Sequence, residues 1–137
     1  MLQIKQNIEE AKKQLTIGNN ELSIILLTLC IEWMGAYLDK KPLKSPKQTK
    51  KRFDNAIKTL LGGHYAALNR DSFFYEHWRN PWIHAGKPGS LFFITRDNTY
   101  KHLSKNEGKK IIFNPDVFLS DIEHAFKKLM FYKEQYI

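Results

Sequence analysis

The chain has 137 residues and a net charge of +8, from 22 lysines and arginines against 14 acidic residues. This length fits one domain better than two, so we expect a single domain over residues 1–137. The one cysteine, Cys30, excludes an internal disulfide, and its apolar surroundings in the sequence predict a place in the core. The positive charge favours an anionic partner, nucleic acid first, with plain solubility as the alternative.

The N-terminal region does not show the pattern of a signal peptide, because charged residues interrupt it throughout. The longest apolar stretch, residues 22–38, contains Glu32 and two hydroxyl residues. A membrane span usually needs about 20 mostly apolar residues. We therefore expect a buried helix here, no membrane partner and a cytoplasmic protein.

Hydrophobic periodicity predicts a mainly α fold of about five helices with a small β-hairpin before the last helix. Apolar spacing, caps and breakers place the helices at 3–17, 20–39, 49–61, from Asp71 or Ser72 through Trp78 to Gly86, and from 115 to about 135. Asn20 is the expected cap of the second helix, and Asn114 that of the last. A turn is expected over 65–68, and the hairpin strands over 91–95 and 110–113.

Residues 39–52 form a basic segment with two prolines and seven positive charges against one negative. One interpretation is a solvated connection. The other is a surface that attracts a phosphate backbone, in which case the residues in contact with nucleic acid would be Lys44, Lys47, Lys50, Lys51 and Arg52.

The most informative stretch is residues 75–86, where Arg79 is followed by Asn80 and, five positions later, by His84. Histidine can move protons near neutral pH, and arginine offers a permanently charged planar fork to phosphate oxygens. Asn80 can position a phosphate or orient His84 without adding charge. On a straight helix Arg79 and His84 lie about 140° apart, whereas Asn80 and His84 share a face. Pro81 either bends the helix or begins a new one with Asn80 as its cap.

Arg79 to His84 resembles the R-x4-6-H motif of the HEPN superfamily, and the order of helices resembles that superfamily as well. The resemblance implies a HEPN-like antiparallel helical bundle that acts as a metal-independent endoribonuclease, usually a homodimer. In that reaction the 2′-hydroxyl attacks the adjacent phosphorus and leaves a 2′,3′-cyclic phosphate. The resemblance further implies RNA as the partner, no cofactor and no metal, and Arg79, Asn80 and His84 as the catalytic residues. The matching biological role is a toxin or defence component with an antitoxin or another protein partner.

Two other functions remain open. The chain can be a catalytically inactive HEPN-like module that binds a protein partner or nucleic acid, which a buried His84 without a surrounding cleft would favour. It can also be a helical nucleic-acid-binding protein that acts by charge alone. In both cases Arg79 is an ordinary ion-pair former and His84 a structural histidine.

Glu32 is the only charged residue between Leu22 and Leu38. A buried carboxylate without a partner is costly. We predict that Glu32 faces the motif helix and pairs with Arg79, orienting its guanidinium. The alternatives are that it reaches solvent or pairs with Arg70 or Arg52.

The remaining histidines and the aromatic residues give weaker signals. His77 and His84 are seven residues apart, and zinc sites generally need more ligands and closer spacing, so no metal site is expected. Three single histidines are expected at the surface: His64, His102 and His124. One aromatic group can stack on bases but is expected in the core or a dimer interface: Phe73, Phe74, Tyr75, Trp78 and Trp82.

Overall fold

The computed structural model describes residues 1–135, and it is mainly helical, as predicted. Within these residues there are six α-helices, with the bounds α1 (Leu2–Thr16), α2 (Asn20–Leu38), α3 (Thr49–Ala56), α4 (Gly63–Leu68), α5 (Asn80–Ala85) and α6 (Pro115–Gln135). A wide π-helical turn, η1 (Ile57–Leu61), follows α3, and a second one, η3 (Tyr75–Arg79), precedes α5. The 3₁₀ turn η2 covers Arg70–Ser72. The helix beyond the expected five is the short α4, where a turn was predicted.

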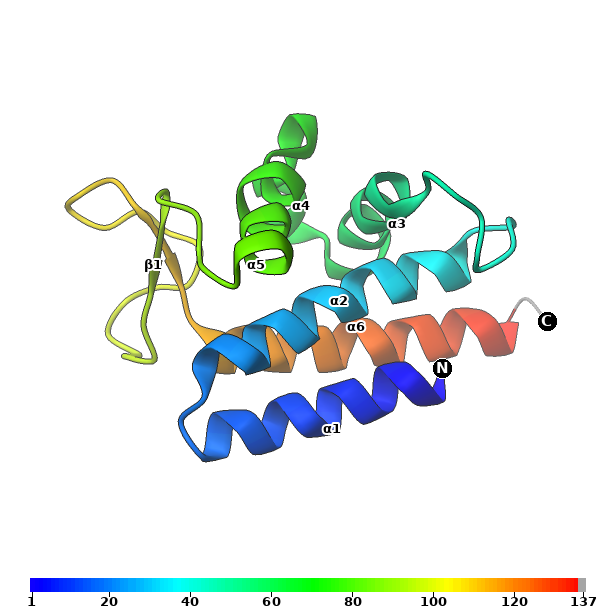
Figure 1. Cartoon of the computed structure of the whole chain (residues 1–137), viewed down its shortest axis with the longest axis horizontal. Coiled ribbons are helices and arrows are strands. Elements are labelled where there is room, and N and C mark those ends of the chain that lie inside the picture. The colour runs from blue at the N-terminus through cyan, green and yellow to red at the C-terminus, as the bar shows by residue number, and fades with distance from the viewer. Residues whose placement is uncertain (136–137) are drawn as a thin grey trace.

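Three long helices, α1, α2 and α6, lie side by side, and α1 runs antiparallel to the other two (Figure 1). The short helices α3, α4 and α5 lie on the other side of α2 from α1 (Figure 1). The turn between α1 and α2 uses Gly18 at a φ of 87°, which favours glycine. Asn19 caps α2 by accepting the Leu22 N–H at 3.2 Å, so the predicted cap, Asn20, is wrong by one residue.

The central helix α2 packs against α1, α3 and α6. Its buried residues cover several faces and include Ile24, Leu27, Cys30, Ile31 and Met34. By length and composition alone α2 is apolar enough to cross a membrane, but a core helix meets the same criterion. The predicted burial of Cys30 is confirmed, and burial raises the pKa of its thiol to about 12.

The two strands, β1 (Phe92–Ile94) and β2 (Ile111–Phe113), lie where strands were expected, but they pair in parallel, so the predicted antiparallel hairpin is wrong. The antiparallel partner of β2 is the segment just before it. The Leu103 N–H donates to the Ile112 carbonyl, and the Ile112 N–H donates to the Ser104 carbonyl, both at 2.7 Å. This short hairpin occupies one edge of β2, so β1 can join only the other edge.

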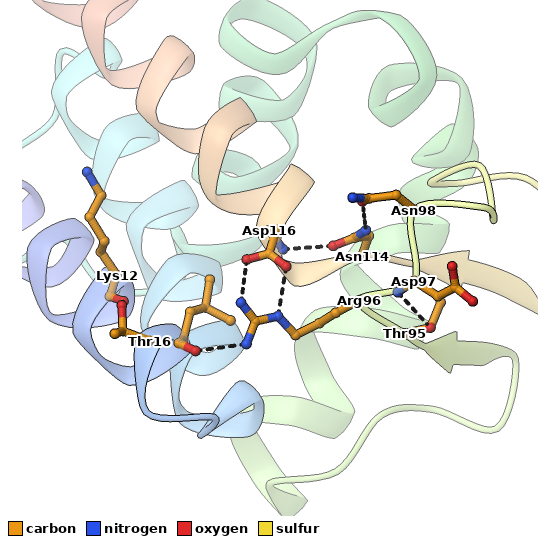
Figure 2. Close-up of polar contacts among 9 residues, drawn as sticks. Lys12, Thr16, Thr95, Arg96, Asp97, Asn98, Asn114 and Asp116 are labelled. Atoms are coloured by element: carbon orange, nitrogen blue, oxygen red, sulfur yellow. Dashed lines mark hydrogen bonds and ion pairs between the residues drawn. The ribbon is translucent and has the colours of Figure 1, made fainter.

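Arg96, in the connection after β1, fixes the start of α6 against the end of α1 (Figure 2). Its guanidinium donates to both carboxylate oxygens of Asp116, at 2.7 and 2.9 Å, and to the Leu15 carbonyl at 2.8 Å. Asn114 accepts the Asp116 N–H at 2.9 Å and so caps α6, as predicted (Figure 2). These contacts hold the connection between β1 and β2 close to the helical bundle.

His102 lies inside the connection between the strands, and the predicted surface position for it is wrong. The Asn114 N–H donates to its Nδ1 at 2.9 Å, and its Nε2 lies 2.8 Å from the Tyr65 hydroxyl. That hydroxyl donates to Asp121 at 2.7 Å. Because Nδ1 accepts a hydrogen bond, the ring is neutral and Nε2 carries the proton. Burial, with a further contribution from His64, lowers the pKa of His102 to about 4.

We therefore expect His102 to make the fold sensitive to acid. Its pKa lies below its ordinary value of 6.5 in the folded chain, so the unfolded chain binds the proton more readily. The stabilisation is complete above about pH 6.5 and is lost as the pH falls toward about 4, by up to about 3 kcal/mol. Urea unfolding across this range measures the loss. His102→Gln should flatten the dependence, whereas His124→Gln, at an exposed position, should leave it unchanged. Equal slopes in the wild type and His102→Gln would contradict the assignment.

Candidate functional site

The motif residues lie on one continuous helical segment, η3 followed by α5. Arg79 and Asn80 both have right-handed helical backbone angles, so the alternative in which Asn80 caps a new helix is wrong. Just before Pro81 the turn widens, and the Asn80 N–H bonds to the carbonyl of Tyr75, five residues back. A proline at 81 cannot donate to the carbonyl four residues back, so a wider turn accommodates it without a break.

The side chain of Arg79 leaves this segment toward α2 and pairs with Glu32. Arg79 Nε donates to Glu32 Oε1 at 2.5 Å. The two side chains are only 11% and 12% exposed. The predicted contact between Glu32 and Arg79 is confirmed, and the alternatives with Arg52 or Arg70 as partner are wrong. The centroid of the Tyr75 ring lies 5.3 Å from the Arg79 guanidinium carbon, within the range of a cation–π contact.

Asn80 extends the contact into a chain of polar groups. Its Oδ1 accepts from Arg79 Nη1 at 3.0 Å, and its Nδ2 donates to Glu76 at 3.3 Å. Glu76 also pairs with Lys50 of α3 at 3.0 Å. This hydrogen bond raises the pKa of Lys50. Three helical segments therefore contribute to one network of alternating charge, which fixes the plane of the Arg79 guanidinium.

His84 lies outside this network. It is exposed near the end of α5, and within residues 1–135 it has no hydrogen-bond partner or ion pair. It follows Asn80 by four residues, so the two side chains project from the same face of α5. The structure thus brings Glu32, Arg79 and Asn80 together, and it leaves His84 one helical turn further along with its ring free to meet a ligand.

The basic segment divides into two parts, a loop over 39–48 and the first turn of α3. The four lysines of the predicted nucleic-acid surface are exposed: Lys44, Lys47, Lys50 and Lys51. Arg52 is only 7% exposed, and its guanidinium donates to Asp39 and to the carbonyls of Pro42 and Leu43. Arg52 therefore shapes the loop from inside, and its predicted position on the binding surface is wrong.

The aromatic residues around the motif are mainly core. Phe74, Trp78 and Trp82 are buried, and Trp78 stacks on Phe113 at 3.7 Å between ring centroids. The Trp78 indole N–H donates to Thr28 at 3.3 Å, which ties the motif segment to α2. Phe73 and Tyr75 are half-buried, with the Phe73 ring beside His77 and the Tyr75 ring beside Arg79.

Sequence reasoning missed Glu76 as a member of the site. The available signal was its spacing of four residues from Asn80, which predicts neighbouring side chains on a helix. It also missed Trp33 and Tyr37, which line a cavity beside Glu32. Within the part of the chain that the structure describes, no cluster of three or more histidine, cysteine or acidic side chains has the arrangement of a metal site.

Comparison of the chain with protein-family models, with curated proteins and with solved structures found no match.

Proposed function

We propose that the protein is a metal-independent endoribonuclease of the HEPN type. The observation that carries the proposal is the held guanidinium of Arg79, bonded to Glu32 and Asn80, with a free His84 one helical turn away. A fixed guanidinium suits the binding of a phosphate, and a free imidazole suits proton transfer. The resemblance of residues 79–84 to the R-x4-6-H motif supports the same activity.

In the proposed reaction the RNA 2′-oxygen attacks the neighbouring phosphorus, and the bond from phosphorus to the 5′-oxygen breaks. His84 either takes the proton of the 2′-hydroxyl or gives one to the leaving 5′-oxygen. In a homodimer two copies of His84 divide these tasks. Arg79 stabilises the charge on the phosphate oxygens, and Asn80 and Glu32 hold its guanidinium. The products are a 2′,3′-cyclic phosphate and a 5′-hydroxyl, and His84 carries the proton transfers that this step needs.

The exposed lysines of the basic segment, Lys44, Lys47, Lys50 and Lys51, are proposed to attract RNA through its phosphates. Such attraction is independent of sequence and weakens as salt is raised. Arg52 has no part in it, because its donors are used within the loop. A role as a toxin or defence component, controlled by a protein partner, fits an activity of this kind.

The test is RNA cleavage in EDTA by the wild type and by His84→Ala. We expect the wild type to leave cyclic phosphate ends and His84→Ala to be slower by a factor of about 10² or more. His84 is exposed and unbonded, so its removal should not disturb folding, which circular dichroism checks. His64→Ala, at another exposed histidine, serves as the matched control and should cleave as the wild type does. Equal cleavage by His84→Ala and the wild type would overturn the proposal.

A second candidate is an inactive HEPN-like module that binds a protein partner or nucleic acid. A buried His84 would have favoured it, but His84 is exposed. The observation that supports it is that no hydrogen bond or ion pair joins His84 to Arg79 within residues 1–135. An intact wild type that binds RNA without cleaving it, with binding reduced by Lys44→Ala or Lys51→Ala, would support this candidate.

A further inference from the structure

A cavity of about 370 Å³ lies beside Glu32, between the start of α1, the second half of α2 and the basic loop. Its volume is at the small end of pockets that hold small ligands, about 300–1,000 Å³. The side chains that matter for its chemistry are Glu32, Trp33, Tyr37, Lys44, Ser45 and Thr49. Glu32 thus both pairs with the Arg79 guanidinium and lines this cavity.

The wall of the cavity formed by the loop is fixed from inside. Arg52 donates to the carbonyls of Pro42 and Leu43, both at 2.7 Å, and to the Asp39 carboxylate at 3.2 Å. These bonds hold the backbone that carries Lys44 and Ser45. The cavity therefore exists before any ligand enters, which lowers the entropy cost of binding.

The opposite wall offers flat aromatic surface. Trp33 and Tyr37 are four residues apart on α2, so they share a face of the helix. Both are half-buried. The Tyr37 ring already lies 5.8 Å from Lys133 Nζ, and its hydroxyl accepts from the Met1 amino group. Trp33 has no aromatic partner within residues 1–135, so it is the ring on which an unpaired base of RNA can stack. The carboxylate of Glu32 makes the same space unfavourable for a phosphate group.

The carboxylate of Glu32, which lines the cavity, has unused hydrogen-bonding capacity. Its Oε1 accepts from Arg79, whereas its Oε2 has no hydrogen-bond partner within the described residues. A carboxylate only accepts hydrogen bonds, so its best partner carries neighbouring N–H donors. Guanine presents two, N1–H and the N2 amino group, on one edge. Adenine and cytosine present one donor beside an acceptor on that edge, and uracil presents one donor between two acceptors.

We propose that this cavity binds a guanine base of the RNA substrate, stacked on Trp33 and hydrogen-bonded to Glu32. The proposal rests on the proposed ribonuclease function and adds its base preference. One carboxylate then both orients Arg79 and recognises the base, which places the guanine next to the phosphate that Arg79 binds. Lys44, at the loop side, can meet the phosphate of the bound nucleotide.

Equilibrium binding of nucleoside 3′-monophosphates to the wild type tests the subsite without any cleavage. Calorimetry should show guanosine 3′-monophosphate binding at least about tenfold more tightly than the adenosine, cytidine and uridine compounds. The nucleotide should also quench tryptophan fluorescence, because Trp33 is half-buried while Trp78 and Trp82 are 0% and 1% exposed.

Three variants assign the binding to the cavity. Trp33→Leu should weaken it by about tenfold, and Glu32→Gln should remove the preference for guanine. Ser45→Phe fills the cavity from the loop and should abolish binding, and circular dichroism checks that the variant is folded. The control is Lys40→Ala, on the same loop but outside the cavity, which should bind as the wild type does.

The outcomes separate the subsite from the ribonuclease. Cleavage that depends on His84, together with equal or absent binding of the four nucleotides, overturns the subsite alone. Guanine-selective binding by a chain that does not cleave RNA overturns the ribonuclease and retains the base site. Guanine-selective binding that survives Ser45→Phe and Trp33→Leu places the nucleotide elsewhere and overturns the subsite.

Discussion

Replacing Gly35 with alanine is expected to lower the free energy of unfolding by about 3 kcal/mol or more. A Cβ atom on Gly35 would lie 1.9 Å from the carbonyl oxygen of Arg52 and 2.5 Å from its carbonyl carbon. Both contacts are with backbone, so no side-chain rotation relieves them. The helices α2 and α3 must separate, and the core packing between them is lost. This loss outweighs the gain of about 1 kcal/mol that alanine brings to a helix interior.

Urea unfolding followed by circular dichroism measures this effect, and Gly108→Ala is the matched control. A Cβ atom on Gly108 would meet only the Asn106 side chain, at 3.5 Å, which is an ordinary contact. We expect that variant to stay within about 0.5 kcal/mol of the wild type. If Gly35→Ala were as stable as Gly108→Ala, the close approach of α2 and α3 would be wrong.

Replacing Glu32 with glutamine is expected to cost about 3 kcal/mol of stability, far more than the same change at Glu76. The side chains of Glu32 and Arg79 are 12% and 11% exposed, so glutamine leaves the Arg79 charge poorly solvated and without a counter-charge. The Glu76 and Lys50 side chains are 45% and 52% exposed, where water replaces the lost interaction. Glu76→Gln should therefore cost less than about 1 kcal/mol.

A double-mutant cycle separates the pair from its surroundings. In Glu32→Gln the further change Arg79→Met removes the uncompensated charge, so the double variant should recover part of the lost stability. Independent, additive losses for the two changes would show that the carboxylate and the guanidinium do not interact in solution.

The Glu32–Arg79 contact was predictable because one charge in a long apolar helix needs a partner. The position of α1 followed from its apolar periodicity, that of α2 from one long apolar stretch, and that of α6 from its start signal and apolar spacing. Other features depend on contacts that no local pattern contains. The parallel pairing of β1 with β2 arises because residues 103–105 take the other edge of β2. His102 is held by groups from α4 and from the start of α6.

In the candidate site, too, some features followed from local sequence and others depend on tertiary contacts. In the sequence of the basic segment, nothing distinguishes the buried Arg52 from the exposed lysines. Arg52 is buried because it donates to loop carbonyls that come within reach only in the folded chain. The cavity beside Glu32 could not be predicted, since three separate segments form its walls. Its aromatic residues gave one local signal, a pair spaced by four residues on the apolar helix α2.

The wide turn η3 also fixes the direction in which the side chains of Arg79, Asn80 and His84 point relative to the helix residues before Tyr75. A π-helical turn holds one residue more than a regular turn, so the residues on its two sides are offset by one position. Deleting one residue between Tyr75 and Asn80 would restore regular bonding, but it would rotate one side against the other by about 100°. Phe74 could then no longer pack against Phe53 and Phe113 in the core while Arg79 reaches Glu32. The length of this segment is therefore under as strict a constraint as the identity of its residues.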